Sequence, residues 1–325
     1  MPQKIIWALL DERQGNTSQT LGVAEALGAP YVTKNIRFNL FTKLPNFLLN
    51  SNTLCVSKET LAELQAPWPD ITITCARRLG IVASYIKSQR PSCFTAQIQW
   101  PGAPSSHFDF IAAPAHDNAH TNKNVFTTLG APHRVTLALL KSEAEKWRAP
   151  LAHLPTPRIA LLIGGSSRGG NFGEHEAKEL AKLSSTLAAT HNASLLITTS
   201  RRTEPSAIKT LSDNLTVPHY LHDWQKNEDG ANPYFGFLGL ADAAIATGDS
   251  VSMCSEACAT GKPLFVYATD AFVSGKHQRF LEKLYAEHLA KPLKQYDTGF
   301  FAPAYRLDDA LLIADQIRTR AGLEN

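Results

Sequence analysis

The chain alternates short apolar runs with longer stretches in which apolar residues recur every three or four positions. Runs of four to eight apolar residues between turn-forming residues are typical of strands, and the longer periodic stretches are typical of helices. Strands are expected over 4–10, 70–74, 93–98, 108–114, 158–164, 193–199, 243–247 and 263–268. Helices are expected over 17–27, 78–88, 133–147, 174–190, 204–212, 234–241, 250–260, 275–290 and 307–320. This alternation predicts an α/β protein with parallel sheets covered by helices on both faces.

A proline-rich segment divides this pattern. Residues 149–158 read "APLAHLPTPR", and a new strand is expected directly after them. A chain of 325 residues is long enough for two domains with separate cores. We therefore predict two Rossmann-like domains, over 1–153 and 154–325, that face each other across a cleft. The helix expected over 307–320 is placed to pack back on the first domain.

Composition narrows the function classes. The chain is 44% hydrophobic and 19% charged, and a net charge of +3 gives no case for a nucleic-acid partner. A run of about 18 apolar residues, which would span a membrane, does not occur. The start, "KIIWALL", resembles neither a signal peptide nor a transit segment. The five cysteines are odd in number and lack C-x-x-C spacing, so a disulfide framework or zinc site is not expected. A reducing cytoplasm fits these features.

The first candidate loop is glycine-rich and follows the strand expected at 158–164. It reads "IGGSSRGGNFG" (163–173) and includes Gly164, Gly165 and Ser166. Glycines allow a close backbone approach, and the amides of such a loop can hold a phosphate. The loop fits neither G-x-G-x-x-G nor the P-loop pattern. A phosphate site and a merely flexible connection therefore both stay open.

Two arginines follow the next strand of the second domain, in "TTSRRTE" (198–204). Paired guanidinium groups favour planar anions such as phosphate, so Arg201 and Arg202 are candidates to bind one. The alternative is a solvated helix start with Thr203 as its cap. The nearby glycine loop favours the anion site.

The stretch "ATGDSVSMCSEACATGKPLFVYA" (246–268) gathers small polar residues at the start of an expected helix. Thr247, Asp249 or Ser250 can cap that helix, whose free amides would then attract an anion, with Ser250 and Ser252 adding hydroxyl groups. Glu256 stands alone on an otherwise apolar helix and needs a partner there. We interpret it as a ligand for a group such as a ribose diol. The alternative is a simple cap followed by a surface carboxylate.

The first expected strand–helix turn is also unusually polar. In "LLDERQGNTSQTLG" (9–22), Asp11, Arg13, Gly15, Asn16 and Gln19 open the helix. Helix capping by Asn16 accounts for part of this composition, but not for Asp11 and Arg13 together. In a two-domain protein this loop would face the loop after the strand at 158–164.

Two further strand ends of the first domain carry candidates. Arg77 and Arg78 in "TCARRLG" can receive an anionic acceptor. In "APAHDNAH", His116 beside Asp117 is the best-placed general base, because an imidazole titrates near neutrality. A surface histidine is the alternative. His116 and His120 with neighbouring Asp117 are not interpreted as a metal site, because a further ligand at a suitable spacing from the two histidines is missing.

Taken together, these motifs resemble a known family. The order of "GGSS" (164–167), "SRRT" (200–203), the block 232–267, the opening "LLDERQGNTSQTLGVAEALG" and "HD" (116–117) resembles the mitochondrial-fission family founded on a plant elongate-mitochondria protein. The resemblance covers nearly the whole chain, and 232–267 is its most specific part. That family is in turn similar to GT-B glycosyltransferases, which implies a GT-B-like fold of two Rossmann-like domains.

The resemblance also implies roles for individual residues. The glycine loop would contact the donor, the start of the later helix its diphosphate, and Glu256 its ribose, whereas Asp249 departs from the pattern because a carboxylate repels a diphosphate. His116 and Asp11 are the candidate catalytic bases. The implied donor-binding set is Gly164, Gly165, Ser166, Arg201, Arg202, Asn232, Thr247, Gly248, Ser250, Ser252 and Glu256. The acceptor side would comprise Arg13, Gly15, Asn16, Gln19, Arg77, Arg78 and Asp117.

The resemblance to GT-B enzymes, which usually need no catalytic metal, implies neither a metal nor any other cofactor, and the absence of Asp-x-Asp agrees with it. Helix amides with Arg201 and Arg202 would stabilise the leaving diphosphate. The segment 34–50 mixes basic residues with phenylalanines and leucines. It is interpreted either as a partly buried helix or as a contact with the inner face of the cytoplasmic membrane.

The leading hypothesis is an enzyme that transfers a sugar from a nucleotide-diphosphate sugar to a lipopolysaccharide or lipid-linked acceptor of the cell envelope. A nucleotide-sugar epimerase with the same fold is an alternative. A further alternative is a non-catalytic adaptor that recruits a partner such as a dynamin-like GTPase, the role that the plant relatives suggest. Nucleic acid is not an expected partner of any of these.

Overall fold

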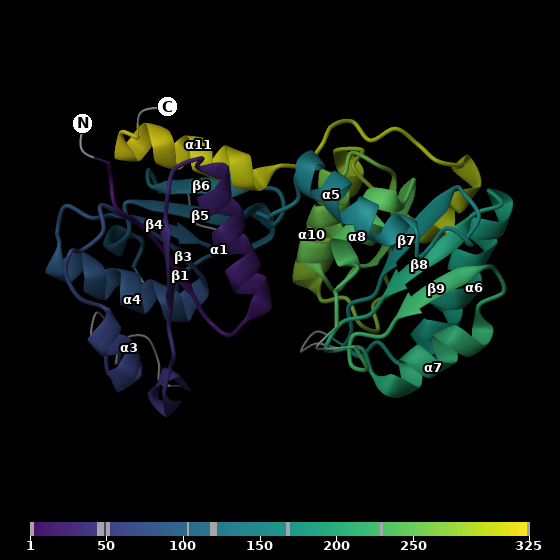
Figure 1. Cartoon of the computed structure of the whole chain (residues 1–325), viewed down its shortest axis with the longest axis horizontal. Coiled ribbons are helices and arrows are strands. Elements are labelled where there is room, and N and C mark those ends of the chain that lie inside the picture. The colour runs from purple at the N-terminus through teal and green to yellow at the C-terminus, as the bar shows by residue number, and fades with distance from the viewer. Residues whose placement is uncertain are drawn as a thin grey trace. The chain divides into compact units, whose positions relative to one another are not determined.

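A computed structural model describes residues 3–43, 49, 53–102, 104–117, 122–166, 170–227 and 230–323. The chain forms two compact units (Figure 1). Unit 1 comprises Met1–Arg134 and Asp308–Asn325, and unit 2 comprises Val135–Leu307. Each unit is an α/β structure built around one parallel sheet.

The sheet of unit 1 has six parallel strands in the order β2-β1-β3-β4-β5-β6. The strands β1, β3 and β5 are buried along their whole length, which explains the continuous apolar runs of β1 and β5. The strands are β1 (Ile6–Leu10), β2 (Val32–Asn35), β3 (Ile71–Cys75), β4 (Phe94–Ile98), β5 (Phe110–Pro114) and β6 (Val125–Thr128).

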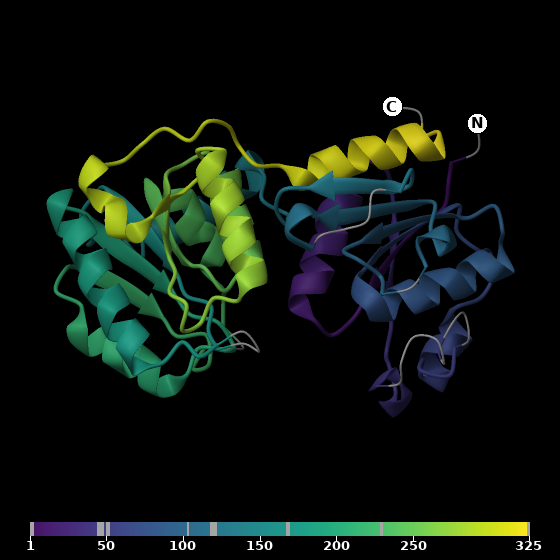
Figure 2. The same cartoon turned by 180° about the vertical axis from the view of Figure 1, so that it is seen from behind.

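Helices cover both faces of this sheet (Figures 1 and 2). On one face, Val23 of α1 and Ile313 and Ile317 of α11 share a core with alternate strand residues. On the other face, Leu79 and Val82 of α4 pack in a second core. The helices are α1 (Gln14–Ala26), α3 (Lys58–Glu63), α4 (Ala76–Gln89) and α11 (Asp309–Ala321), with 3-10 turns η1 (Leu40–Lys43), η2 (Ser105–His107) and η3 (Ala115–Asp117).

The chain returns to unit 1 through its last helix. Asp309, in the first turn of α11, accepts a hydrogen bond from the amide of Gly130 at 2.7 Å and is almost fully buried. The apolar stripe of α11 then lies on α1 and the sheet. The final helix therefore belongs to the core of unit 1.

The sheet of unit 2 also has six parallel strands, in the order β12-β11-β10-β7-β8-β9. After β7 the chain adds β8 and β9 on one side and then crosses back to add β10 on the other. Right-handed crossovers in opposite directions place helices on opposite faces. The strands are β7 (Arg158–Leu162), β8 (Ser194–Thr198), β9 (His219–His222), β10 (Ala243–Thr247), β11 (Leu264–Tyr267) and β12 (Lys291–Pro292).

The helices of unit 2 include one that the sequence assigned to the first domain. Trp147 of α5 stacks edge-on against Phe237 of α8 at 5.9 Å between ring centroids. Gly239 allows this approach, since a Cβ there would overlap the carbonyl oxygen of Leu140. The helices are α5 (Leu137–Arg148), α6 (Glu174–Thr190), α7 (Pro205–Asn214), α8 (Tyr234–Leu240), α9 (Val251–Ala259) and α10 (Gly275–Ala286), with the 3-10 segment η4 (Leu293–Thr298).

The sequence predicted a boundary between the two domains at 153/154. Because α5 packs on α8, the structure places this boundary at 134/135. The proline-rich segment is a folded part of unit 2 and not a linker. Leu151 and Leu154 are buried, and the guanidinium of Arg158 donates to both of their carbonyl oxygens, at 2.9 and 3.2 Å. The segment therefore packs onto unit 2 instead of separating two domains, while Pro150 and Pro155 stay exposed on it.

Residues 34–43, the part of the segment 34–50 that the structure describes continuously, do not form the helix considered for it. Lys34 lies in strand β2, and its ammonium group sits 4.7 Å from the ring centroid of Trp7. Only a short turn, η1, follows at Leu40–Lys43, while residues 44–48 and 50 lie outside the described part. All five cysteines are buried and free.

Candidate functional site

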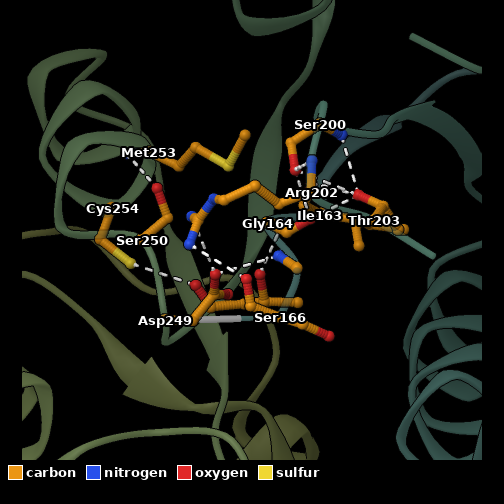
Figure 3. Close-up of polar contacts among 12 residues, drawn as sticks. Ile163, Gly164, Ser166, Ser200, Arg202, Thr203, Asp249, Ser250, Met253 and Cys254 are labelled. Carbon is orange, nitrogen blue, oxygen red and sulfur yellow. Dashed lines mark hydrogen bonds and ion pairs between the residues drawn. The ribbon is translucent and has the colours of Figure 1, made fainter. Parts of the chain in front are cut away.

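Three of the candidate loops meet at the carboxyl edge of the sheet in unit 2. They follow β10, β7 and β8, which are neighbours in the sheet in that order. The chain reverses its winding between β7 and β10, and ligands of open α/β sheets bind at such a switch point. The topology therefore brings together the loops 163–166, 199–203 and 247–250, which the sequence singled out separately (Figure 3).

Hydrogen bonds lock the glycine loop to both of its neighbours. The amide of Gly164 donates to the hydroxyl of Thr247 at 2.8 Å. The carbonyl of Gly164 accepts from the hydroxyl of Ser200 at 2.5 Å and from that of Thr203. Ser200 and Thr203 are residues of this site that the sequence analysis did not assign to it. Gly164 is thus held by the loops on both sides, which a merely flexible connection would not require.

The amides of the next two residues, Gly165 and Ser166, also donate hydrogen bonds to the neighbouring loops of unit 2. The amide of Gly165 donates to Asp249 at 3.0 Å, and the amide of Ser166 donates to the carbonyl of Arg202 at 3.2 Å. A Cβ at Gly165 would overlap that same carbonyl oxygen. These glycines therefore allow loop-to-loop contact, and their amides do not point freely toward a ligand.

Asp249 sits at the centre of this arrangement. It is 3% exposed and accepts from Gly165 and, at 3.3 Å, from Nη2 of Arg202. Burial raises the pKa of Asp249, and the surrounding donors with Arg202 offset only part of that effect. The structure also identifies the cap of α9 as Ser250, whose hydroxyl accepts from the amide of Met253 at 3.4 Å. Asp249 thus points inward and is not the helix cap.

The start of α9 has the free groups expected of an anion site. The amides of Val251 and Ser252 begin the helix, so they have no intrahelical acceptor. Ser250 and Ser252 are partly exposed beside them. Arg201 is exposed on the neighbouring loop, and the side chain of Arg202 is 43% exposed although it reaches Asp249. The positive charge of this region faces solvent.

Glu256 lies in the second turn of α9 and has a protein partner. The carboxylate is 8% exposed and accepts a hydrogen bond of 2.5 Å from the hydroxyl of Tyr234. Burial raises the pKa of Glu256 to about 7, and the Tyr234 bond opposes that shift. Burial and the nearby Glu256 carboxylate raise the pKa of Tyr234 well above its usual value.

The sequence analysis missed Tyr234 and interpreted its neighbour Asn232 differently. Oδ1 of Asn232 accepts from the amide of Tyr234 at 3.0 Å, so this side chain orders the start of α8. Gly248 is surrounded by apolar side chains, and a Cβ there would approach Cδ1 of Leu281 to 2.8 Å. Both residues therefore have packing or turn roles in unit 2.

Unit 1 has its own switch point, between β1 and β3. Here the carboxylate of Asp11 forms an ion pair with Arg78 at 2.9 Å and accepts from the amide of Arg13 at 3.1 Å. Arg78 also pairs with Glu12 at 2.6 Å and lies over the ring of Phe38. The arginine predicted to receive an acceptor is thus held by two carboxylates of its own unit.

Of the remaining residues of the predicted acceptor side, Asn16 and Gln19 lie at the same switch point, 3.9 and 3.7 Å from Sγ of Cys75. Nε2 of Gln99 donates to the buried Gln19 at 3.1 Å, while Asn16 donates to a carboxylate of the same turn. Gly15 is exposed, and a Cβ there would meet open space. Arg77 donates to the carbonyl of Thr42 at 2.9 Å.

The two candidate bases lie on the same edge of the sheet but apart from each other. His116 and Asp117 form η3 after β5, and His116 is 3% exposed. Three strand spacings separate β1 from β5, which places Asp11 about 14 Å from that strand. His116 and Asp11 are therefore alternatives and not a pair. His120 lies outside the described residues, among which no three His, Cys, Asp or Glu side chains group as metal ligands.

The fold is that of the GT-B class. A UDP-GlcNAc 2-epimerase from Neisseria meningitidis bound to UDP-GlcNAc superposes with a TM-score of 0.53 at 14% identity, over 99% of this chain and all of that one. The S. aureus MnaA-UDP co-structure gives 0.54 at 10% identity, over 99% and 97% of the chains. A glycosyltransferase from Rickettsia africae ESF-5 gives 0.51 at 13% identity, over 99% and 91%. At these identities the likeness is one of fold.

The chain belongs to the Mitochondrial fission ELM1 family, which it matches over residues 14–321. An uncharacterized protein of Rickettsia prowazekii (strain Madrid E) is 30% identical in an alignment 346 residues long, which covers 96% of this chain and 97% of that protein. The Mitochondrial fission protein ELM1 of Arabidopsis thaliana is 30% identical in an alignment 225 residues long, which covers 62% of this chain and 52% of the plant protein. The resemblance inferred from the motifs is confirmed.

Proposed function

We propose that unit 2 binds a nucleotide-diphosphate sugar and that the protein transfers the sugar to a lipopolysaccharide or lipid-linked acceptor of the cell envelope. One observation carries this proposal. Glu256, a carboxylate oriented by Tyr234, lies in the same helix whose free amino-terminal amides stand at the switch point of the sheet.

Each group suits one part of such a ligand. The amides of Val251 and Ser252 would bind a phosphate at the positive end of α9. Arg201 and the exposed part of Arg202 would add the charge that stabilises a departing diphosphate. Glu256, about one turn along the helix, would accept hydrogen bonds from a ribose diol. No metal is needed in this proposal.

His116 is the preferred base in this proposal. Three donors already hold the carboxylate of Asp11, so an acceptor hydroxyl would have to displace one of them. An imidazole titrates near neutrality and can take a proton from a sugar hydroxyl at physiological pH. Because His116 is buried, the acceptor would have to reach it below the surface of unit 1.

A different observation favours a second candidate, a non-catalytic adaptor. The amides of Gly164, Gly165 and Ser166 all donate to groups of unit 2, so none of these three amides is free to bind a diphosphate. The chain also belongs to a family named for mitochondrial fission. A shell of this fold without turnover would fit both facts.

A peripheral membrane contact through 34–50 would bring the enzyme to a lipid-linked acceptor. Leu40 is 82% and Phe41 58% exposed, and Leu54 is also largely exposed. Exposed apolar side chains of this size insert into the interface of a bilayer. Within the described residues, none of the helices is long and apolar enough to cross one.

The experiment that tests this function is titration calorimetry with UDP-, GDP-, ADP- and CMP-linked sugars. One of them should bind, and Glu256→Ala should weaken it at least tenfold. Glu287→Ala, which removes an exposed carboxylate of the same unit, is the matched control and should leave the affinity unchanged. Equal affinities of the wild type and Glu256→Ala would refute the site.

Incubation with the bound nucleotide sugar then separates the candidate functions. Transfer requires an added acceptor, such as a lipid-linked sugar or a lipopolysaccharide core. An epimerase would produce the isomeric nucleotide sugar from the donor alone. An adaptor would bind without releasing nucleotide or producing an isomer under either condition.

A further inference from the structure

At the switch point of unit 2, the position between the carboxyl ends of β7 and β10, called the crevice below, is occupied by a carboxylate of the protein itself. Asp249 follows β10 and reaches across to the loop that follows β7. It is almost fully buried, so the position is filled (Figure 3). An α/β sheet ordinarily receives the anionic part of a ligand in this crevice.

The groups around the Asp249 carboxylate are those that bind phosphate elsewhere. One is the backbone N–H of Gly165 in a glycine loop, at 3.0 Å, and the other is the guanidinium of Arg202, at 3.3 Å. Asp249 therefore acts as a resident anion. An incoming phosphate would have to compete with it for both donors and would also meet its charge.

The surrounding backbone is shaped around this carboxylate. A Cβ at Gly164 would overlap both carboxylate oxygens of Asp249. The bonds from Gly164 to Thr247 and from Thr203 to Gly164 hold the loops on either side. Ser250, the next residue, caps α9 and fixes the backbone that carries the carboxylate. The carboxylate is thus built into the site and cannot swing away as a surface side chain would.

We propose that Asp249 is a specificity-determining residue that keeps a diphosphate out of the crevice between β7 and β10. A ligand phosphate is then confined to the amides at the start of α9 and to the exposed arginines, outside the crevice. This inference rests on the proposed function for the identity of the nucleotide ligand. The exclusion itself concerns inorganic diphosphate and is measured without a nucleotide.

Calorimetry with inorganic pyrophosphate tests the proposal. Asp249→Ser removes the charge and vacates space, so it should bind pyrophosphate at least tenfold more tightly than the wild type. Asp249→Asn removes the charge but still fills the crevice, so its gain should be smaller. Arg202→Met added to Asp249→Ser should abolish the gain, which locates it in the crevice. Asp309→Asn, which neutralises a buried aspartate of unit 1 that also accepts backbone amides, should change nothing.

Two results would overturn the proposal. One is a wild type that binds pyrophosphate as tightly as Asp249→Ser and Asp249→Asn do. The other is weaker binding by these two variants than by the wild type. Should the variants fold poorly, 15N-glycine-labelled wild type gives an independent measurement. The amide resonance of Gly165 should not move on addition of pyrophosphate, and a saturable shift would refute the exclusion.

The same data separate this proposal from the proposed function. If the wild type binds none of the four nucleotide sugars while Asp249→Ser gains pyrophosphate, the function fails and the exclusion stands. If the wild type binds a nucleotide sugar and neither variant gains pyrophosphate, the function stands and the exclusion fails.

Discussion

Replacing Glu256 with glutamine should change how stability depends on pH. Burial raises the pKa of Glu256 from 4.5 to about 7, so the folded state holds this proton more tightly than the unfolded state. The contribution of the protonated Glu256 to the free energy of unfolding is therefore complete below pH 4.5 and is lost as the pH rises through 7. A difference of roughly 2.5 units, at 1.36 kcal/mol for each unit, amounts to about 3 kcal/mol.

Glutamine has nearly the same shape, can still accept from Tyr234 and does not titrate. Relative to the wild type, the free energy of unfolding of the Glu256→Gln protein should therefore increase by about 3 kcal/mol between pH 4.5 and pH 8. Urea unfolding of unit 2, followed at intervals from pH 4.5 to 8, measures this difference. Glu287→Gln, at an exposed position, should run parallel to the wild type. If the stability of Glu256→Gln also changes with pH as that of the wild type does, the pKa of Glu256 is not raised in the folded protein.

Further predictions concern the glycine loop and the apolar surface of unit 1. Gly164→Ala should destabilise unit 2 by about 2 kcal/mol or more because its Cβ overlaps a buried carboxylate. Gly15→Ala, which meets open space near a helix start, should cost nothing, and equal melting temperatures for the two would contradict the close packing. Thr203→Val leaves the amide of Ser200 without its acceptor and should lower the free energy of unfolding, measured by chemical denaturation, by about 1–3 kcal/mol. Leu40→Ser with Phe41→Ser should weaken sedimentation with anionic vesicles and leave the melting temperature unchanged; undiminished binding would exclude this surface.

Central strands were predictable from the sequence, and edge strands were not. The strands β1, β7, β8 and β10 are buried on both faces and consist mainly of apolar residues, while β3, equally buried, alternates isoleucine with threonine. The four that the pattern did not indicate, β2, β6, β9 and β12, are the outer strands of the two sheets. Their side chains are partly exposed, and β12 has only two residues. An apolar pattern marks burial, which these strands largely lack.

The domain boundary was misplaced for a related reason. Prolines in 149–158 are typical of linkers, but whether a segment packs depends on what lies opposite it. Here the missing information was the contact of Trp147 with Phe237, residues 90 positions apart. Local composition cannot contain such a contact.

The position of the candidate site could be derived, but its internal bonding could not. Alternating strands and helices place the three loops of unit 2 at one edge of the sheet, and the order β10-β7-β8 makes them neighbours. The pairing of Glu256 with Tyr234 and the inward turn of Asp249 depend on side-chain directions in the folded unit. Only the apolar surroundings of Glu256 signalled that it needed a partner.

Both units close their switch point with an aspartate and an arginine. Asp11 pairs with Arg78 between β1 and β3, and Asp249 pairs with Arg202 beside β7 and β10. In each case the guanidinium that the sequence assigned to a ligand has a carboxylate of its own unit as a partner. Polar residues at a strand end therefore indicate where a site can lie, but not which of its groups are free.

The central claim is that unit 2 binds a nucleotide-diphosphate sugar. Titration calorimetry of the wild type with UDP-, GDP-, ADP- and CMP-linked sugars measures it most directly. One nucleotide sugar should bind with a single site per chain and at least tenfold more weakly to Glu256→Ala, and it should raise the melting temperature because it binds only the folded protein. The absence of binding heat and of a melting shift with all four would contradict the claim.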